Sequence, residues 1–211
     1  MNTQEHIVEA LKKYRLVPVI TINDPKDTIP LCKALINGGL PVAEMTFRTA
    51  AAEEAIAIAA KEFPDMLVGA GTVITTDQVD RAKAAGATFL VSPGFNPKIV
   101  THAMNSGIPM FPGINNPSDI EGALELGLDV LKFFPAEASG GLPLLKAMSA
   151  PYTGVRFMPT GGISPDNVLK YLANPKVVAC GGSWMVPSDL MAAGKFEEIE
   201  ALVKQAVSLT A

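Results

Sequence analysis

A single lysine lies in the middle of a short apolar segment, DVLKFFPAE, at residues 129–137. Lysine is rarely fully buried, because moving its ammonium group out of water costs several kcal/mol. One interpretation is that Lys132 stands at the end of a strand and its amine reaches solvent. The other is that an apolar pocket keeps the amine neutral, which is the form that attacks a carbonyl carbon.

Polar residues at the ends of such apolar segments are few, and they are the candidates for chemistry. Two-residue alternation places Glu44 on one face with Thr46, and it places Lys132 on one face with Phe134. A carboxylate that shares a dry cavity with an amine is suited to proton transfer. A structural buried ion pair and two unrelated rim charges are the alternatives. The full set is Thr21, Glu44, Thr46, Arg48, Thr72, Ser92, Lys132, Thr160 and Ser183.

Two glycine pairs indicate where an anion could bind. TGGIS at 160–164 and CGGS at 180–183 each follow an apolar segment near the C-terminal end of the chain. Glycine lets the backbone approach a ligand closely, and Ser183 adds a hydroxyl. In a (β/α)₈ barrel the loops after the seventh and eighth strands commonly bind phosphate. Glycine pairs also occur in simple turns, which is the alternative interpretation.

The elements that must position these residues repeat along the chain. Apolar, β-branched or aromatic segments alternate with helix-like stretches, a pattern typical of a parallel sheet covered on both faces. Eight such units without a composition break predict one (β/α)₈ barrel domain over residues 1–211, with an extra N-terminal helix. An open flavodoxin-like or Rossmann sheet is the alternative, but GAGTVI at 69–74 lacks the third glycine of a dinucleotide fingerprint. The eight segments are residues 16–20, 42–46, 66–71, 88–92, 108–112, 129–134, 155–160 and 177–182.

Helix boundaries are marked by capping residues. A capping side chain precedes proline at Asp24-Pro25, Asn96-Pro97, Asn116-Pro117 and Ser164-Pro165. Thr75 and Gln78 have the spacing of a capping box. Helices are expected to end at glycines in the left-handed conformation, which are Gly38, Gly86, Gly107 and Gly127.

Composition excludes several classes of function. The 211 residues carry a net charge of −4 and no basic tract, which argues against nucleic acid or a membrane surface as partner. The two histidines, His6 and His102, are unclustered, so we expect no catalytic metal site. The weak dinucleotide fingerprint and the absence of a P-loop motif go with an expectation of no cofactor. Two distant cysteines and no apolar leader or membrane-length segment indicate a cytoplasmic protein.

The same segments resemble those of a known enzyme family. GLPVAEMTFR at 39–48 and GLDVLKFFPAEASGG at 127–141 are similar to two signature segments of the 2-keto-3-deoxy-6-phosphogluconate (KDPG) aldolases. GAGTV at 69–73, VSPG at 91–94, FMPTGGISPDN at 157–167 and GGSWMVP at 181–187 also resemble that family, in the expected order. The resemblance spans essentially the whole chain.

The resemblance implies a class I, Schiff-base and metal-independent aldolase of the lyase class, usually a homotrimer. Such an enzyme cleaves KDPG to pyruvate and glyceraldehyde 3-phosphate in the Entner–Doudoroff pathway of carbohydrate metabolism. Many relatives also cleave 4-hydroxy-2-oxoglutarate to pyruvate and glyoxylate. Some relatives carry an arginine at the end of the first strand, where this chain has Thr21. Binding of the substrate carboxylate would then rest mainly on Arg48.

By position, the resemblance makes Lys132 the Schiff-base lysine and Glu44 the general acid and base, acting through a bound water. The remaining residues would bind substrate: Arg48 and Thr72 at the carboxylate, Pro93 and Phe134 around the pyruvyl group, Thr160 near the hydroxyls, and Gly161, Gly162, Gly182 and Ser183 at the phosphate.

Two other functions are compatible with the same residues. A phosphate-binding barrel isomerase or synthase could use Glu44 as a base and Lys132 as an electrostatic partner, without a covalent intermediate. A non-catalytic barrel could bind a sugar phosphate as a sensor. A sensor would need neither Lys132 nor Glu44 on an inward face.

Overall fold

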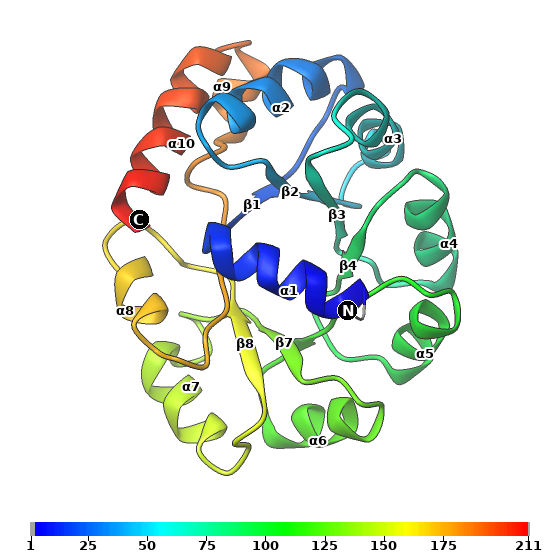
Figure 1. The fold of residues 1–211 in the computed structure, drawn as a ribbon, viewed down its shortest axis with the longest axis vertical. Coiled ribbons are helices and arrows are strands. Elements are labelled where there is room, and N and C mark those ends of the chain that lie inside the picture. Colours follow the sequence, from blue (N-terminus) through cyan, green and yellow to red (C-terminus); the bar gives the residue numbers. More distant parts are fainter. Residues whose placement is uncertain (1–2, 211) are drawn as a thin grey trace.

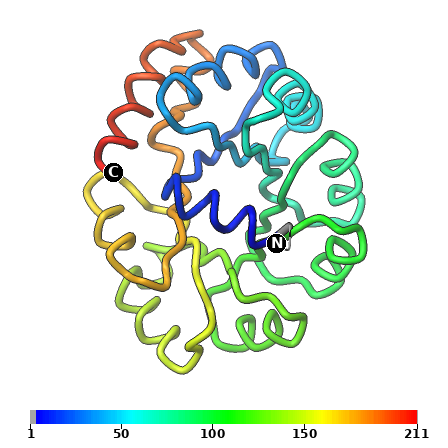
Figure 2. The backbone as a smooth tube through the Cα atoms, in the orientation of Figure 1, coloured from blue at the N-terminus to red at the C-terminus, as the bar shows by residue number. Residues whose placement is uncertain are grey.

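A computed structural model describes residues 3–210 of the chain, in which parallel strands form an inner ring and helices surround it (Figure 1). The chain runs once around this ring from the N-terminus to the C-terminus (Figure 2). The strands are β1 (Leu16–Ile20), β2 (Val42–Thr46), β3 (Leu67–Gly71), β4 (Phe89–Val91), β5 (Met110–Phe111), β6 (Gly113–Ile114), β7 (Val130–Phe133), β8 (Arg156–Pro159) and β9 (Cys180–Gly182). The helices are α1 (Thr3–Tyr14), η1 (Pro25–Asp27), α2 (Thr28–Asn37), α3 (Ala52–Glu62), α4 (Thr76–Ala84), α5 (Pro97–Asn105), α6 (Pro117–Glu125), α7 (Gly141–Ser149), α8 (Val168–Leu172), α9 (Ser188–Ala192) and α10 (Phe196–Thr210).

Hydrogen bonding closes the strands into a barrel. One sheet has the order β5-β4-β3-β2-β1-β9 and the other the order β6-β7-β8. β5 and β6 are one strand segment interrupted at Pro112, which has no N–H to donate. On the far side, bridges between Phe157 and Val177 and between Thr160 and Gly181 join β8 to the β9 segment. The predicted (β/α)₈ barrel is therefore confirmed.

Most of the predicted helix boundaries are found, and two differ. Asn96 and Asn116 cap α5 and α6 as predicted, and Asp24 caps the short 3-10 helix η1. The prediction at Ser164-Pro165 is wrong, because these residues form a turn and α8 begins only at Val168.

The helix end predicted at Gly38 also differs. The left-handed residue there is Gly39, at φ 86°, whereas Gly38 has helical geometry at φ −72°. A Cβ atom on Gly38 would lie 2.4 Å from Cγ1 of Val203, so this glycine lets α10 pack closely on α2.

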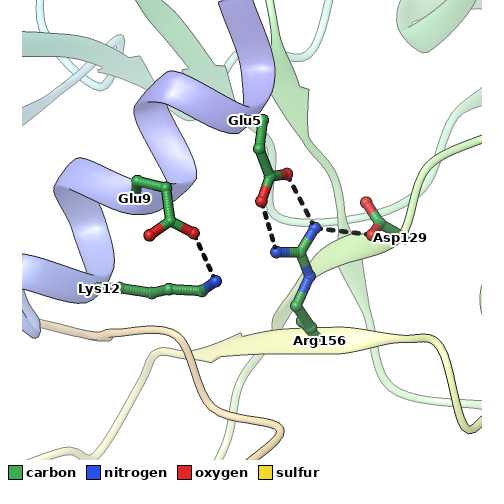
Figure 3. A network of polar contacts seen from close by, with 5 residues as sticks. All are labelled: Glu5, Glu9, Lys12, Asp129 and Arg156. Carbon is green, nitrogen blue, oxygen red and sulfur yellow. Dashed lines mark hydrogen bonds and ion pairs between the residues drawn. The ribbon is translucent and has the colours of Figure 1, made fainter. Parts of the chain in front are cut away.

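Helix α1 lies across the end of the barrel where the strands begin (Figure 1). Ile7, Val8 and Leu11 are buried and Tyr14 is partly buried, so α1 is amphipathic and turns one apolar face to the barrel. Its polar side is held by Arg156 at the start of β8, which donates to both carboxylate oxygens of Glu5 at 3.3 and 3.2 Å (Figure 3). Arg156 also donates to Asp129, at 2.7 Å. One guanidinium thus ties the N-terminal helix to the two strands β7 and β8.

We expect Arg156→Met to loosen α1 in a pH-dependent way. Loss of this half-exposed network should cost about 1 kcal/mol, a fall in Tm of roughly 2–4 °C at neutral pH. The hydrogen bonds from Arg156 lower the pKa of Glu5, so their contribution is complete above the ordinary carboxyl pKa of about 4.3 and is lost as pH falls below it. Thermal melts of both proteins from pH 7 to pH 3 should therefore converge at low pH. Lys12→Met removes an exposed pair with Glu9 and only the smallest of the charge effects on Glu5, so it is the matched control and should shift Tm little.

Candidate active site

Lys132 and Glu44 meet in the interior of the barrel. Lys132 comes from β7 and Glu44 from β2, on opposite sides of the ring, and Lys132 Nζ donates to Glu44 Oε1 at 3.2 Å. Lys132 is 4% exposed and Glu44 is 0% exposed. The structure therefore excludes both the solvent-reaching lysine and the two unrelated rim charges. Burying both charges costs folding free energy, and an apolar pair of similar volume is often at least as stable. The pair is therefore better explained by a role in function than by a role in stability.

The surroundings of this pair favour exchange of a proton with a bound molecule. The second carboxylate oxygen of Glu44, Oε2, is buried and forms no hydrogen bond within residues 3–210. The amine of Lys132 lies 5.1 Å from the centre of the Phe134 ring. The amine of Lys132 therefore has a proton acceptor directly beside it, which suits it to acid–base or nucleophilic chemistry.

Gly71, at the end of β3, makes the space that Glu44 occupies. A Cβ atom on Gly71 would lie 2.4 Å from Glu44 Oε1 and 2.7 Å from its Cγ. β2 and β3 pair side by side, with Thr46 opposite Gly71, so no side chain at this position could avoid the carboxylate. The sequence analysis did not single out Gly71, although a glycine at the end of a buried strand is a recognised sign of close approach.

We expect Gly71→Ala to lower turnover without unfolding the protein. The added methyl group should push the Glu44 carboxylate away from Lys132, and a displacement of about 1 Å in a catalytic group costs on the order of 100-fold. Steady-state turnover with thermal melting measures the two effects separately. Gly154→Ala is the matched control, because a Cβ atom there has nothing within 4 Å. Unchanged turnover in Gly71→Ala would show that the position of Glu44 is unimportant.

Most of the predicted binding residues surround one small cavity at the C-terminal ends of the strands. The cavity measures about 110 Å³ and adjoins a larger one of about 490 Å³ that shares Val19, Arg48 and Ser183 in its lining. Thr21, which stands where some relatives carry arginine, lines the larger cavity. The small cavity is lined by Val19, Arg48, Phe134, Thr160, Gly161, Gly162, Ile163, Gly182 and Ser183.

Arg48 is the cation of this cavity, and it is exposed at the loop that follows β2. The two glycine pairs face each other there, because Thr160 and Gly181 are bridged across β8 and β9. A guanidinium and two close-approaching backbone loops form an arrangement suited to an anionic ligand. The sequence analysis missed Val19 and Ile163, which are apolar and carry no chemical signal.

Thr72 and Pro93 lie outside the lining of the small cavity. Thr72 follows Gly71 directly and is held in the left-handed region at φ 57°, where a residue other than glycine is strained. Pro93 is exposed after β4, and its carbonyl oxygen lies so close to Gly113 that a Cβ atom there would be 2.2 Å away. Both residues share the rim with the other candidates, at the ends of β3 and β4.

Metal-binding side chains do not converge in the described part of the chain. Within residues 3–210, no group of three or more His, Cys, Asp or Glu side chains is arranged to hold a metal ion. Cys32 and Cys180 are buried free thiols, and burial raises the pKa of each to about 12. None of the described helices has the length and apolar character needed to cross a bilayer.

Comparison with known proteins gives consistent matches over nearly the full chain. The family model described as KDPG and KHG aldolase matches residues 7–202. A 2-dehydro-3-deoxy-phosphogluconate aldolase of Treponema pallidum (strain Nichols) is 51% identical over 96% of this chain and 97% of its own. The enzyme of the same name from Haemophilus influenzae is 47% identical over 98% of both chains. Among solved structures, a KDPG aldolase from Legionella pneumophila has a TM-score of 0.91 and 40% identity, covering 94% of this chain and 97% of that one. That structure holds pyruvate captured at low pH as a covalent carbinolamine intermediate.

Proposed function

Because the chain belongs to the KDPG and KHG aldolase family, we propose that it is a class I aldolase that cleaves KDPG to pyruvate and D-glyceraldehyde 3-phosphate. The observation that carries the proposal is the contact between Lys132 and Glu44, which buries an amine beside a carboxylate and next to Phe134, a residue that lines the anion-suited cavity. The covalent pyruvate adduct of the Legionella relative supports the same chemistry. The second activity in the family description extends the proposal to 4-hydroxy-2-oxoglutarate.

The reaction starts at the C2 ketone of the substrate. The Lys132 amine attacks this carbon, and the resulting carbinolamine loses water to give a cationic iminium. The iminium accepts the electron pair of the C3–C4 bond as that bond breaks. Glu44 takes the proton of the C4 hydroxyl, so the C4 fragment leaves as an aldehyde. Its Oε2, which has no hydrogen-bond partner among the described residues, is the oxygen available for this proton.

The second half of the reaction returns the enzyme to its starting state. The enamine left on Lys132 takes a proton at C3, and Glu44 can supply the one it has just received. Water then hydrolyses the iminium and releases pyruvate. Because the same carboxylate accepts and returns the proton, it must stay next to the reacting carbons throughout, which is the position that Gly71 makes possible.

The other residues hold the two charged ends of the substrate. Arg48 binds the carboxylate together with Thr72, and Pro93 and Phe134 enclose the pyruvyl group. Thr160 lies near the hydroxyls, and Gly161, Gly162, Gly182 and Ser183 bind the phosphate. The phosphate is remote from the bond that breaks, so its binding energy serves to position that bond over Lys132.

The wider setting follows from the family. We propose that residues 1–211 act as one barrel domain, that the enzyme is a cytoplasmic homotrimer and that it serves the Entner–Doudoroff pathway. Nucleic acid and membranes are not among its partners, and no cofactor is needed, because the lysine itself supplies the electron sink.

Pyruvate release tests the proposal directly. The purified chain is incubated with KDPG, and pyruvate is measured by coupling to lactate dehydrogenase and NADH. We expect steady release with KDPG and slower release with 4-hydroxy-2-oxoglutarate, which lacks the phosphate. Binding of either compound without pyruvate release would contradict the proposal and favour a sensor.

A further inference from the structure

In the loop after β8, residues 160–163, backbone carbonyl groups are hydrogen-bonded to neighbouring elements of the described chain while some backbone N–H groups are not. The carbonyl oxygens of Thr160 and Gly161 accept hydrogen bonds from the backbone N–H groups of Ala136 and Glu137, at 2.8 and 3.0 Å. The carbonyl oxygen of Gly162 accepts one from Asn167 Nδ2 at 2.9 Å. The N–H group of Gly161 faces β9 in the bridge between Thr160 and Gly181, whereas those of Gly162 and Ile163 have no hydrogen-bond partner within residues 3–210. Two successive free amides in a turn of this kind form a concave site for an anion, called a nest.

Glu137 supports this loop from the segment that follows β7. Its backbone N–H holds the Gly161 carbonyl, and its side-chain stem lies against Gly162, where a Cβ atom would be 2.6 Å from Glu137 Cβ. Tyr171 of α8, which is buried, donates its hydroxyl to Glu137 Oε1. Burial, together with the Glu137 carboxylate, raises the pKa of Tyr171, so the phenol stays protonated and remains a donor.

Asn167 supports the loop from the other side. Its amide nitrogen holds the Gly162 carbonyl, and its side-chain oxygen accepts from the backbone N–H of Ser164 at 2.9 Å. One side chain thus bridges the loop at two points, four residues before Tyr171. The two glycines are both in the left-handed region, at φ 97° and 78°, a conformation that such external bonds must hold in place.

We propose that Asn167 and the Glu137–Tyr171 pair are positioning residues that hold loop 160–163 with the amides of Gly162 and Ile163 free, and that they thereby set the preference for phosphorylated over unphosphorylated keto acids. The inference rests on the proposed function and deepens it. None of the three side chains lines the small cavity, so they act through the loop and not by touching the substrate. The Phe134 ring would be 3.3 Å from a Cβ atom on Gly161, so the loop also packs on the ring beside Lys132.

Asn167→Ala is the first test, with two substrates. For KDPG we expect KM to rise roughly tenfold, as expected for the loss of one or two net hydrogen bonds, while kcat changes by less than about threefold. For 4-hydroxy-2-oxoglutarate, which has no phosphate, kcat/KM should stay within about twofold of the unmodified enzyme. Asn174→Ala is the matched control, because Asn174 lies beyond the other end of α8 and its side chain, within residues 3–210, accepts only from the backbone N–H of Lys176. An equal loss on both substrates would overturn the inference, because it would indicate general damage to the barrel.

Tyr171→Phe is the second test, and it keeps the buried ring while removing the hydroxyl that holds Glu137. We expect KM to rise for KDPG and not for 4-hydroxy-2-oxoglutarate, as in Asn167→Ala. If KM for KDPG does not rise, the Glu137–Tyr171 pair does not position the loop. Calorimetric titration with inorganic phosphate provides a readout that does not depend on turnover. The unmodified protein should bind phosphate, and Asn167→Ala should bind it roughly tenfold more weakly. Equal affinity in the two proteins, or no binding in the unmodified one, would overturn the inference, whereas phosphate binding without pyruvate release would contradict only the proposed function.

Discussion

Lys132→Ala is expected to abolish pyruvate release, lowering turnover by a factor on the order of 10⁵ or more, the scale found when a covalent nucleophile is removed. No other described lysine is placed in the barrel interior with a carboxylate partner, so no side chain can replace its amine. The loss is measured as the rate of pyruvate release from KDPG at saturating substrate. A variant that keeps more than about 1% of the turnover would contradict the assignment.

The fold must be controlled in this experiment, because Lys132→Ala leaves the carboxylate of Glu44 buried without its cation. Breaking a buried pair in this way costs about 3–5 kcal/mol. The double variant Lys132→Met with Glu44→Gln removes both charges and keeps most of the volume. We expect this double variant to melt close to the unmodified protein and still to be inactive, which separates the loss of chemistry from the loss of stability.

Glu44→Gln is expected to separate adduct formation from turnover. The amide keeps the size of the carboxylate but cannot take up the proton of the C4 hydroxyl, and a lost general base costs roughly 10²–10⁴-fold. Lys132 remains, so the variant should still form a reducible adduct with pyruvate. Rapid-quench measurement of adduct formation beside steady-state turnover gives both values. Turnover within about threefold of the unmodified enzyme would show that another group moves the proton.

The fold could be predicted from sequence because its signals are local. Buried parallel strands are continuous apolar segments, and Asn96 and Asn116 cap their helices through side chains adjacent in sequence. The error at Gly38 occurred because a contact distant in sequence decides the residue there. Gly38 is needed because of Val203, which lies far along the chain in α10, and the sequence alone does not show that contact.

In the candidate site too, features with a local sequence pattern could be predicted, and features that depend on contacts between distant residues could not. Period-two alternation placed Lys132 and Glu44 on inward faces, and closure of the barrel brings them within 3.2 Å of each other. The space left by Gly71 and the bond from Tyr171 to Glu137 were not predicted, because both depend on contacts between separate elements. Side chains that act through their neighbours carry no distinctive residue pattern.

Borohydride trapping tests the central claim most directly. The protein is incubated with pyruvate, reduced with sodium borohydride and examined by intact-mass spectrometry and peptide mapping. We expect the mass of one reduced pyruvyl group, located on Lys132 and absent when pyruvate is omitted or Lys132 is replaced by alanine. An unmodified protein, or an adduct on a different lysine, would contradict the Schiff-base mechanism and favour non-covalent chemistry at the same site.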